Sequence, residues 1–228
     1  MHTPQQRRCW RPLFSTLAVA AAVLAAPILR AHAQATPATK PAKPFVPHKE
    51  TMAEAITQAD GITEGVIDHI WVATDESFHH GDYYRIIAEL RVCVEADPMF
   101  TEAYGDASWL LWSLGDTEGA DKLLTYGLTR RPKLWDLQYE FGFHLYNTKR
   151  YAPALSHLKA ATQIPGADVQ SWKMLAHCYD RLGRYADAVA TWKTIQKKFP
   201  HEITTPHNLA SMEAKLKAQR SGGGAKPK

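Results

Sequence analysis

The stretch that decides the fold is residues 169–202, which read VQSWKMLAHCYDRLGRYADAVATWKTIQKKFPHE. Trp172, Leu175 and Tyr179 share one face of a helix, because steps of three and four residues match the helical turn. Gly183 follows, and a glycine there suits the left-handed conformation that ends a helix. The apolar pattern then resumes with the same period. The stretch therefore predicts two helices joined by a tight turn.

The same pattern recurs upstream at a fixed interval, without insertion or deletion, in units that begin at Val169, Trp135, Thr101 and Ile67. Prolines that follow the second helix, where a helix must already have ended, occur in three units at Pro98, Pro132 and Pro200. A period of this size is the signature of a solenoid, in which each unit packs on its neighbours. The expected helices are residues 64–79, 83–96, 102–113, 118–129, 134–147, 152–163, 169–181 and 185–198.

The units resemble the tetratricopeptide repeat, a helix–turn–helix motif with Trp, Leu-Gly, Tyr, Ala, aromatic and Pro residues at fixed offsets. The resemblance covers residues 67–202 and implies an all-α, right-handed α-solenoid of four units. Gln138 stands where the motif has its Trp and Lys149 where it has its turn Gly, and in the first unit Ile70 and Ser77 replace the Trp and the Tyr. These departures affect local packing rather than the fold.

Two further helical segments flank the units. Residues 203–219 are expected to form an amphipathic helix that caps the open end of the stack, which solenoids need for solubility, and residues 220–228 a disordered tail. Residues 51–66 are expected to contain a short separate helix over 51–59, because Asp60-Gly61 is a turn pattern.

The segment 1–33 resembles a secretory signal peptide, with a basic start, an apolar stretch over 13–29 and Ala31-His32-Ala33 as a small-x-small cleavage site. We expect cleavage after Ala33 and export to a bacterial periplasm or out of the cell, and an uncleaved membrane anchor is the alternative. Residues 34–50 are rich in Pro, Ala and Lys, which predicts an extended linker.

The charge balance argues against a nucleic-acid partner. Four arginines in the segment 1–33, with no acid there, account for the whole formal charge of +4. The rest of the chain carries 23 Lys and Arg against 23 Asp and Glu. No basic stripe that could follow a phosphate backbone is present in the sequence.

Few residues suggest chemistry. Cys93 and Cys178 lie more than two repeats apart, too far for a disulfide in a stacked array, so we expect free, buried thiols. The pattern His79-His80-x-Asp82 is the best metal-like cluster, but adjacent side chains on a helix point apart. We therefore predict no metal, no cofactor and no catalytic residue, and hence a protein that is not an enzyme.

The functional prediction rests on a second face of the first helices, which by the resemblance lines the concave groove that receives a partner. Large aromatic residues crowd this face, and such residues are enriched at binding hot spots. The predicted groove consists of Trp71, Phe78, Trp109, Trp112, Tyr139, Phe143, Tyr146, Lys173 and His177, with a rim of Asp68, Glu102, Asp136, Asp180 and Arg181.

An aromatic groove with acidic edges suits an extended, proline-rich and basic segment of another protein, because a polyproline helix loses little entropy on docking. The chain's own residues 39–45, TKPAKPF, are such a segment. The sequence thus predicts a non-catalytic protein–protein interaction scaffold of the cell envelope. Alternatives are a groove filled by its own neighbours or by the 51–59 helix, self-association, a glycan or cell-wall ligand and, last, an enzyme subunit.

Overall fold

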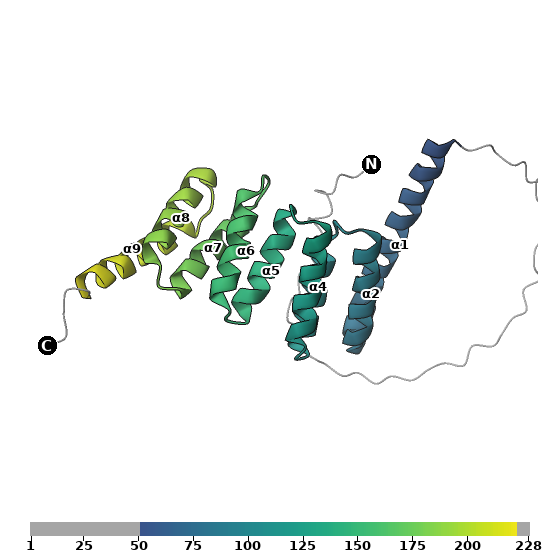
Figure 1. Ribbon diagram of the computed structural model, residues 1–228, viewed down its shortest axis with the longest axis horizontal. Coiled ribbons are helices and arrows are strands. Elements are labelled where there is room, and N and C mark those ends of the chain that lie inside the picture. Colours follow the sequence, from purple (N-terminus) through teal and green to yellow (C-terminus); the bar gives the residue numbers. More distant parts are fainter. Residues whose placement is uncertain (1–50, 223–228) are drawn as a thin grey trace, which may run out of the picture. The chain divides into compact units, whose positions relative to one another are not determined.

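The computed structural model describes residues 51–222, and every regular element in that part of the chain is an α-helix (Figure 1). The predicted signal peptide, the linker and residues 223–228 of the tail fall outside the described residues. The helices are α1 (Met52–His80), α2 (Tyr83–Ala96), α3 (Thr101–Ser113), α4 (Thr117–Arg130), α5 (Trp135–Asn147), α6 (Tyr151–Gln163), α7 (Val169–Arg181), α8 (Tyr185–Lys198) and α9 (Thr205–Gly222).

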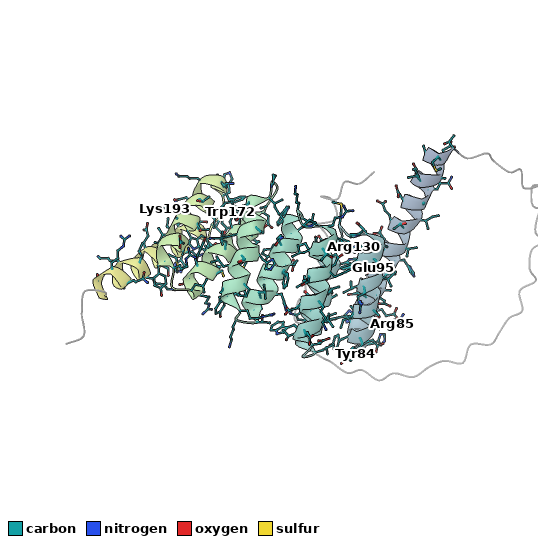
Figure 2. The ribbon with its side chains drawn as sticks, in the orientation of Figure 1. Tyr84, Arg85, Glu95, Arg130, Trp172 and Lys193 are labelled. Carbon is teal, nitrogen blue, oxygen red and sulfur yellow. The ribbon has the colours of Figure 1, made fainter. Side chains whose placement is uncertain are left out.

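The helices stack as four successive pairs followed by α9. Each helix packs on the next one along the chain, and α5 also packs directly on α3 and on α7. The first helices α3, α5 and α7 therefore lie side by side. Second helices are bridged too, since Arg130 on α4 donates to the carbonyl oxygen of Val94 at 3.0 Å and to Glu95 Oε2 at 3.1 Å (Figure 2). The structure confirms the predicted all-helical stack.

The turns inside the four units share one backbone conformation. Gly81, Gly115 and Gly183 have φ angles of 77°, 91° and 68°, and Lys149 has 64°. This left-handed conformation ends the first helix of each unit and is easy for glycine but strained for a side-chain-bearing residue. The predicted helix stop is confirmed, and the third unit keeps it in spite of its lysine.

The predicted helices from residue 83 to 198 match the structure within one residue at each end. The capping helix begins at Thr205 and runs to Gly222, so residues 220–222 are helical rather than part of a tail. Met212 of α9 is buried, and Leu209 and Leu216 pack beside it against the apolar cluster formed by α5–α8. The cap therefore covers the last unit as expected.

The prediction of a separate helix over residues 51–59 is wrong. One helix runs from Met52 to His80, through Asp60 and Gly61. It starts at a capping box, in which Thr51 Oγ1 accepts from Glu54 N at 3.3 Å and Thr51 N donates to Glu54 Oε2 at 2.8 Å. A glycine inside a helix costs about 1 kcal/mol, which is too little to end a helix that continues on both sides.

Continuity of α1 also bears on the groove. Residues 51–59 extend the axis of α1, so they do not fold back into the groove as a separate helix. That way of filling the groove, which the sequence left open, is excluded.

Apolar side chains form two clusters, one around α1–α5 and one around α5–α9, and Phe141 packs against both. Cys93 and Cys178 are free and buried, as predicted. Burial raises the pKa of both thiols to about 11, so they are protonated near neutral pH. Within residues 51–222, no helix has both the length and the apolar character needed to span a bilayer.

Candidate protein-binding groove

Two contacts fix how α3 and α5 lie against each other. Thr101 Oγ1 donates to Asp136 Oδ2 at 3.0 Å. One turn further along both helices, a Cβ placed on Gly105 would lie 2.9 Å from Glu140 Oε2. Both contacts join residues at the same sequence separation, and they advance in the same direction along the two helices. The helices are therefore parallel, and Trp109 lies level with Phe143 and His144.

An aromatic patch follows from this register, and we define it as Trp109, Trp112, Tyr139 and Phe143. Trp109 exposes 49% of its surface, although most large aromatic side chains of the stack are more deeply packed. The rings of Tyr139 and Phe143 stack with centroids 5.8 Å apart and planes 10° apart. By the α3–α5 register, Phe143 of this stack lies level with Trp109 on the neighbouring helix. The patch is thus a two-helix surface with aromatic rings on both sides.

One end of the patch opens into a shallow pocket. Its volume is about 450 Å³, and its lining residues are Trp112, Thr117, Asn147, Thr148, Lys149 and Arg150. The opposite end of the patch lies at the N-termini of α3 and α5, which carry Glu102 and Asp136. The surface therefore runs from an acidic end, across aromatic rings, to an end that carries Lys149.

The predicted groove residues on α1 are partly buried and pack against the core. The Trp71 ring meets Phe100 edge-on, with centroids 5.0 Å apart, and the Phe78 ring meets Tyr83 at 5.8 Å. Both side chains pack against the N-terminal apolar cluster. Asp68, predicted as rim, is exposed on the same helix. The structure does not bring this end of the predicted groove into the aromatic patch.

Tyr146 lies at the C-terminal edge of the patch and is engaged within the fold. Its hydroxyl accepts from Arg181 Nε at 3.1 Å, and its ring meets Tyr151 at a centroid distance of 5.3 Å. Arg181 was predicted as rim, and it links α7 to α5 there. The pair holds the two first helices together.

The α7 part of the predicted groove is likewise occupied by neighbouring side chains. Lys173 Nζ lies 3.4 Å from Glu202 Oε1, with the two side chains only 16% and 15% exposed. Asp180 accepts from Lys215 on α9 at 2.7 Å. The ring of His177 packs on a buried tryptophan of α8, and burial, the largest effect, lowers the His177 pKa. The candidate site therefore narrows to α3 and α5.

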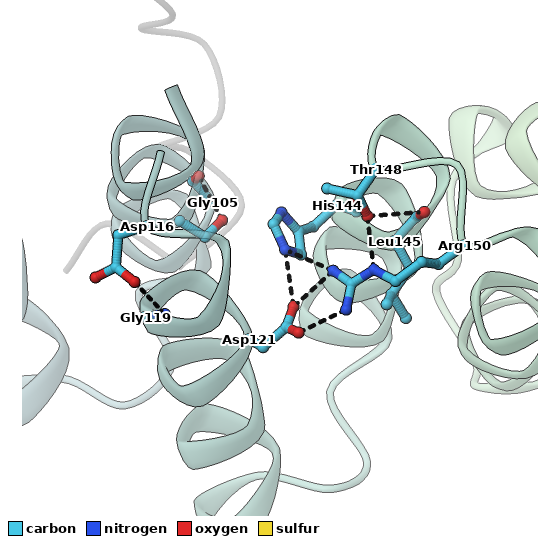
Figure 3. A network of polar contacts seen from close by, with 9 residues as sticks. Gly105, Asp116, Gly119, Asp121, His144, Leu145, Thr148 and Arg150 are labelled. Carbon is cyan, nitrogen blue, oxygen red and sulfur yellow. Dashed lines mark hydrogen bonds and ion pairs between the residues drawn. The ribbon is translucent and has the colours of Figure 1, made fainter. Parts of the chain in front are cut away.

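A polar network that the sequence analysis missed joins the second unit to the third (Figure 3). Asp121 on α4 accepts from Arg150 at 2.6 and 2.8 Å and is 2.8 Å from His144 Nε2. Arg150 Nε also donates to Thr148 Oγ1 at 2.9 Å. These bonds fix the turn that carries Lys149, and with it one end of the patch.

The network shifts the pKa values of its members. Hydrogen bonds from Arg150, the largest effect, lower the Asp121 pKa and keep this carboxylate charged. Burial lowers the His144 pKa, against the opposing influence of Asp121. The sequence held a clue: His144 occupies the slot that is Leu110 and Cys178 in the neighbouring units. A titratable residue at a buried apolar position requires a polar partner.

Nothing in the described part of the chain has the form of a metal centre: no group of three or more His, Cys, Asp or Glu side chains in residues 51–222 could hold an ion. In the His79-His80-x-Asp82 cluster, His79 Nε2 is 3.8 Å from Asp75, and His80 Nδ1 is hydrogen-bonded to the Glu76 carbonyl oxygen at 2.9 Å. These side chains are engaged with their own helix.

No protein-family model matches the chain, and neither does any curated protein. Solved structures do resemble it. PilF of Pseudomonas aeruginosa has a TM-score of 0.56 and 16% identity, over 72% of this chain and 79% of PilF. MamA of Desulfovibrio magneticus RS-1 has a TM-score of 0.53 and 19% sequence identity, over 69% of this chain and 89% of MamA. YrrB is described as a TPR protein with an unusual peptide-binding site. It has a TM-score of 0.50 and 17% sequence identity, over 74% of this chain and 84% of YrrB.

Proposed function

We propose that this chain, which has the tetratricopeptide-repeat fold, is a non-catalytic scaffold that binds an extended segment of a partner protein along the aromatic patch. The observation that carries the proposal is the exposure of Trp109 on α3, together with the stacked rings of Tyr139 and Phe143 on the adjacent α5. Exposed aromatic surface on a rigid pair of helices supplies contact area at low entropic cost. The peptide-binding site described for YrrB gives this use of the fold a precedent.

The chemistry of the patch suggests the kind of segment. Proline-rich chains dock on aromatic surfaces because their extended conformation is set before binding. Basic residues of the segment would lie near the acidic N-terminal ends of α3 and α5, where Glu102 and Asp136 contribute negative charge. At the other end, Lys149 favours an acidic residue or a C-terminal carboxylate. The segment thus combines a proline-rich centre with Lys or Arg at one end.

A comparison of bound partners tests the groove. We expect Trp109→Ala/Tyr139→Ala/Phe143→Ala to keep the helical circular dichroism of the unchanged protein and to lose a partner in crosslinking and affinity capture from cells. The matched control is Tyr84→Ala, because Tyr84 is an aromatic residue that exposes 77% of its surface on α2 (Figure 2). An identical set of partners for both variants and the unchanged protein would show that the patch is internal packing.

The chain's own linker is the first candidate segment, since residues 36–49 read TPATKPAKPFVPHK. A synthetic peptide of that sequence should change the tryptophan fluorescence of the protein on titration. The same peptide with its three lysines replaced by glutamate should bind more weakly, because the acidic end of the patch would repel it. Equal binding of the two peptides would argue against the electrostatic part of the proposal.

The proposed place of action is the cell envelope, reached by export under the direction of the segment 1–33. Its basic start, apolar stretch and small-x-small site support this proposal. Cell fractionation combined with N-terminal sequencing tests it. The protein should appear in the periplasm or the medium and begin at Gln34, whereas intact protein in the cytoplasm would contradict export.

A further inference from the structure

The N-terminal half of α1, residues 52–66, extends beyond the helix on which the rest of α1 packs (Figure 1). α1 has 29 residues and α2 has 14, so at about 1.5 Å per residue α1 is about twice as long. The first buried residue of α1 is Ile67. A lone helix of this length is marginal in water, so packing against another surface would stabilise it.

The extension is amphipathic. Met52, Ile56 and Val66 expose 79%, 54% and 47% of their surface and, at helical spacing, form one stripe, with Ile62 at its edge. The stripe leads directly into Ile70, which packs on the core of the first unit. The exposed stripe is therefore a continuation of a core-facing surface, and no helix among residues 51–222 covers it. Solvent-exposed apolar stripes of this kind mark contact sites.

Charge restricts what can cover the stripe. α1 contains six Asp and Glu residues and no Lys or Arg. Two copies of α1 packed on each other would therefore bring like charges together, which is unfavourable. A basic surface is the complementary partner.

Such a surface lies at the other end of the stack. A groove of about 590 Å³ between α8 and α9 has an apolar floor and a charged rim, and its lining includes Ala186, Val189, Leu216, Lys193, Lys217 and Arg220. Lys193 Nζ is 3.0 Å from Glu213 Oε1 across it (Figure 2 labels Lys193). Residues 185–222 carry six Lys and Arg against three Asp and Glu. This end is basic.

The groove also lies at a packing position that the repeat pattern defines. α9 occupies the place of a first helix in a fifth unit, since it packs on α8 as α7 packs on α6. Within residues 51–222 no second helix follows α9, so the groove lies where that helix would pack. An amphipathic helix fits this position.

We propose that the N-terminal half of α1 of one molecule packs into the α8–α9 groove of a second copy, head to tail. The apolar stripe would cover the floor formed by Val189 and Leu216, and the acids of α1 would face Lys217 and Arg220. Within one molecule α1 and α9 lie at opposite ends of the stack, so the contact forms between molecules (Figure 1). Each pairing leaves one helix and one groove open, so longer assemblies follow.

Sedimentation velocity of the full chain tests the proposal with two variants. Ile56→Asp/Ile62→Asp alters the helix, and Lys217→Glu/Arg220→Glu alters the rim of the groove; all four residues are exposed. The unchanged protein should associate with rising concentration, and each variant should weaken association about tenfold or more. The control Arg131→Glu/Lys133→Glu makes the same charge change in the α4–α5 loop and should associate normally.

Mixing the two variants distinguishes head-to-tail pairing from other modes. Each molecule then has one intact surface, so an equimolar mixture should form a dimer and stop there. Association should weaken between about 0.05 M and about 0.5 M salt, because salt screens the complementary charges. Three results would overturn the proposal: a monomer up to about 0.1 mM, a groove variant that associates normally, or a mixture that stays monomeric.

Discussion

Arg181 on α7 donates a hydrogen bond to the hydroxyl of Tyr146 on α5 at 3.1 Å, and the two residues are 35 positions apart. Lys215 and Asp180 join α9 to α7 at the same separation, and Thr101 and Asp136 join α3 to α5. The separation is one repeat plus one residue. These contacts hold the first helices parallel, and so set the surface on which a partner segment would lie.

The turn of the third unit gives a test of backbone strain. Lys149→Gly should stabilise the protein by about 1 kcal/mol, because Lys149 holds the left-handed conformation that glycine adopts freely. Thermal unfolding should shift upward by about 2–4 °C. The reciprocal change Gly115→Lys should destabilise by a similar amount, since no neighbouring atom lies within 4 Å of a Cβ there and only the backbone is affected. Unchanged midpoints in both variants would contradict the assignment.

Two glycines inside helices should respond oppositely to alanine. A Cβ on Gly142 would meet Leu158 Cγ at 2.7 Å, so Gly142→Ala should cost about 1–3 kcal/mol through overpacking. Gly61 has no atom within 4 Å of such a Cβ, so Gly61→Ala should raise helix content and stabilise α1 by up to about 1 kcal/mol. Denaturant unfolding and circular dichroism measure both effects. A loss of helix in Gly61→Ala would speak against a continuous α1.

Acid should destabilise the fold from about pH 6.5 downward. Burial lowers the pKa values of His144, His157 and His177 below their usual 6.5. Below pH 6.5 the unfolded chain binds protons at these histidines that the folded chain does not. The free energy of unfolding therefore decreases as the pH decreases. The lowered pKa of Asp121 extends the loss to more acidic pH, because its stabilising charge disappears only there.

His144→Leu checks this account, since Leu110 fills the equivalent slot of the second unit. Between pH 7 and about 5 the variant should lose less stability than the unchanged protein. The reason is that leucine binds no proton, so the difference in proton binding between the unfolded and folded states at this position is removed. An identical pH dependence in the two proteins would mean that His144 titrates normally in the fold.

The cap gives a test of the C-terminal end. Met212 is 5% exposed, and Met212→Ala should destabilise the α8–α9 contact by about 2 kcal/mol, near the low end for buried methionine. Amide hydrogen exchange should show the largest loss of protection in α9, with α3 and α5 little changed, since repeat arrays lose structure locally. Uniform loss over the whole stack would contradict a cap that is coupled mainly to its neighbour.

The fold was predictable because the constant repeat length fixes the position of every turn from Gly81 to Gly183. The binding site was less predictable from the sequence. Helical spacing placed Trp71, Trp109 and Tyr139 on the corresponding face of their respective first helices. It carries no information about which side chains of other helices pack against that face. Phe100, Tyr151 and Glu202 contact predicted groove residues, and only the three-dimensional arrangement of the helices reveals these contacts. The prediction that Asp60-Gly61 ends a helix was wrong for another reason. A turn dipeptide does not end a helix when the residues on both sides favour the helix.

The measurement that tests the central claim most directly is site-specific photo-crosslinking in cells. A photoreactive residue at Tyr139, in the aromatic patch, should capture a partner protein, whereas one at Tyr84, on the exposed face of α2, should capture none or a different one. A crosslinked peptide from the Tyr139 adduct should be extended, proline-rich and basic. Capture of the same partner from both positions, or from Tyr84 alone, would contradict a binding groove between α3 and α5.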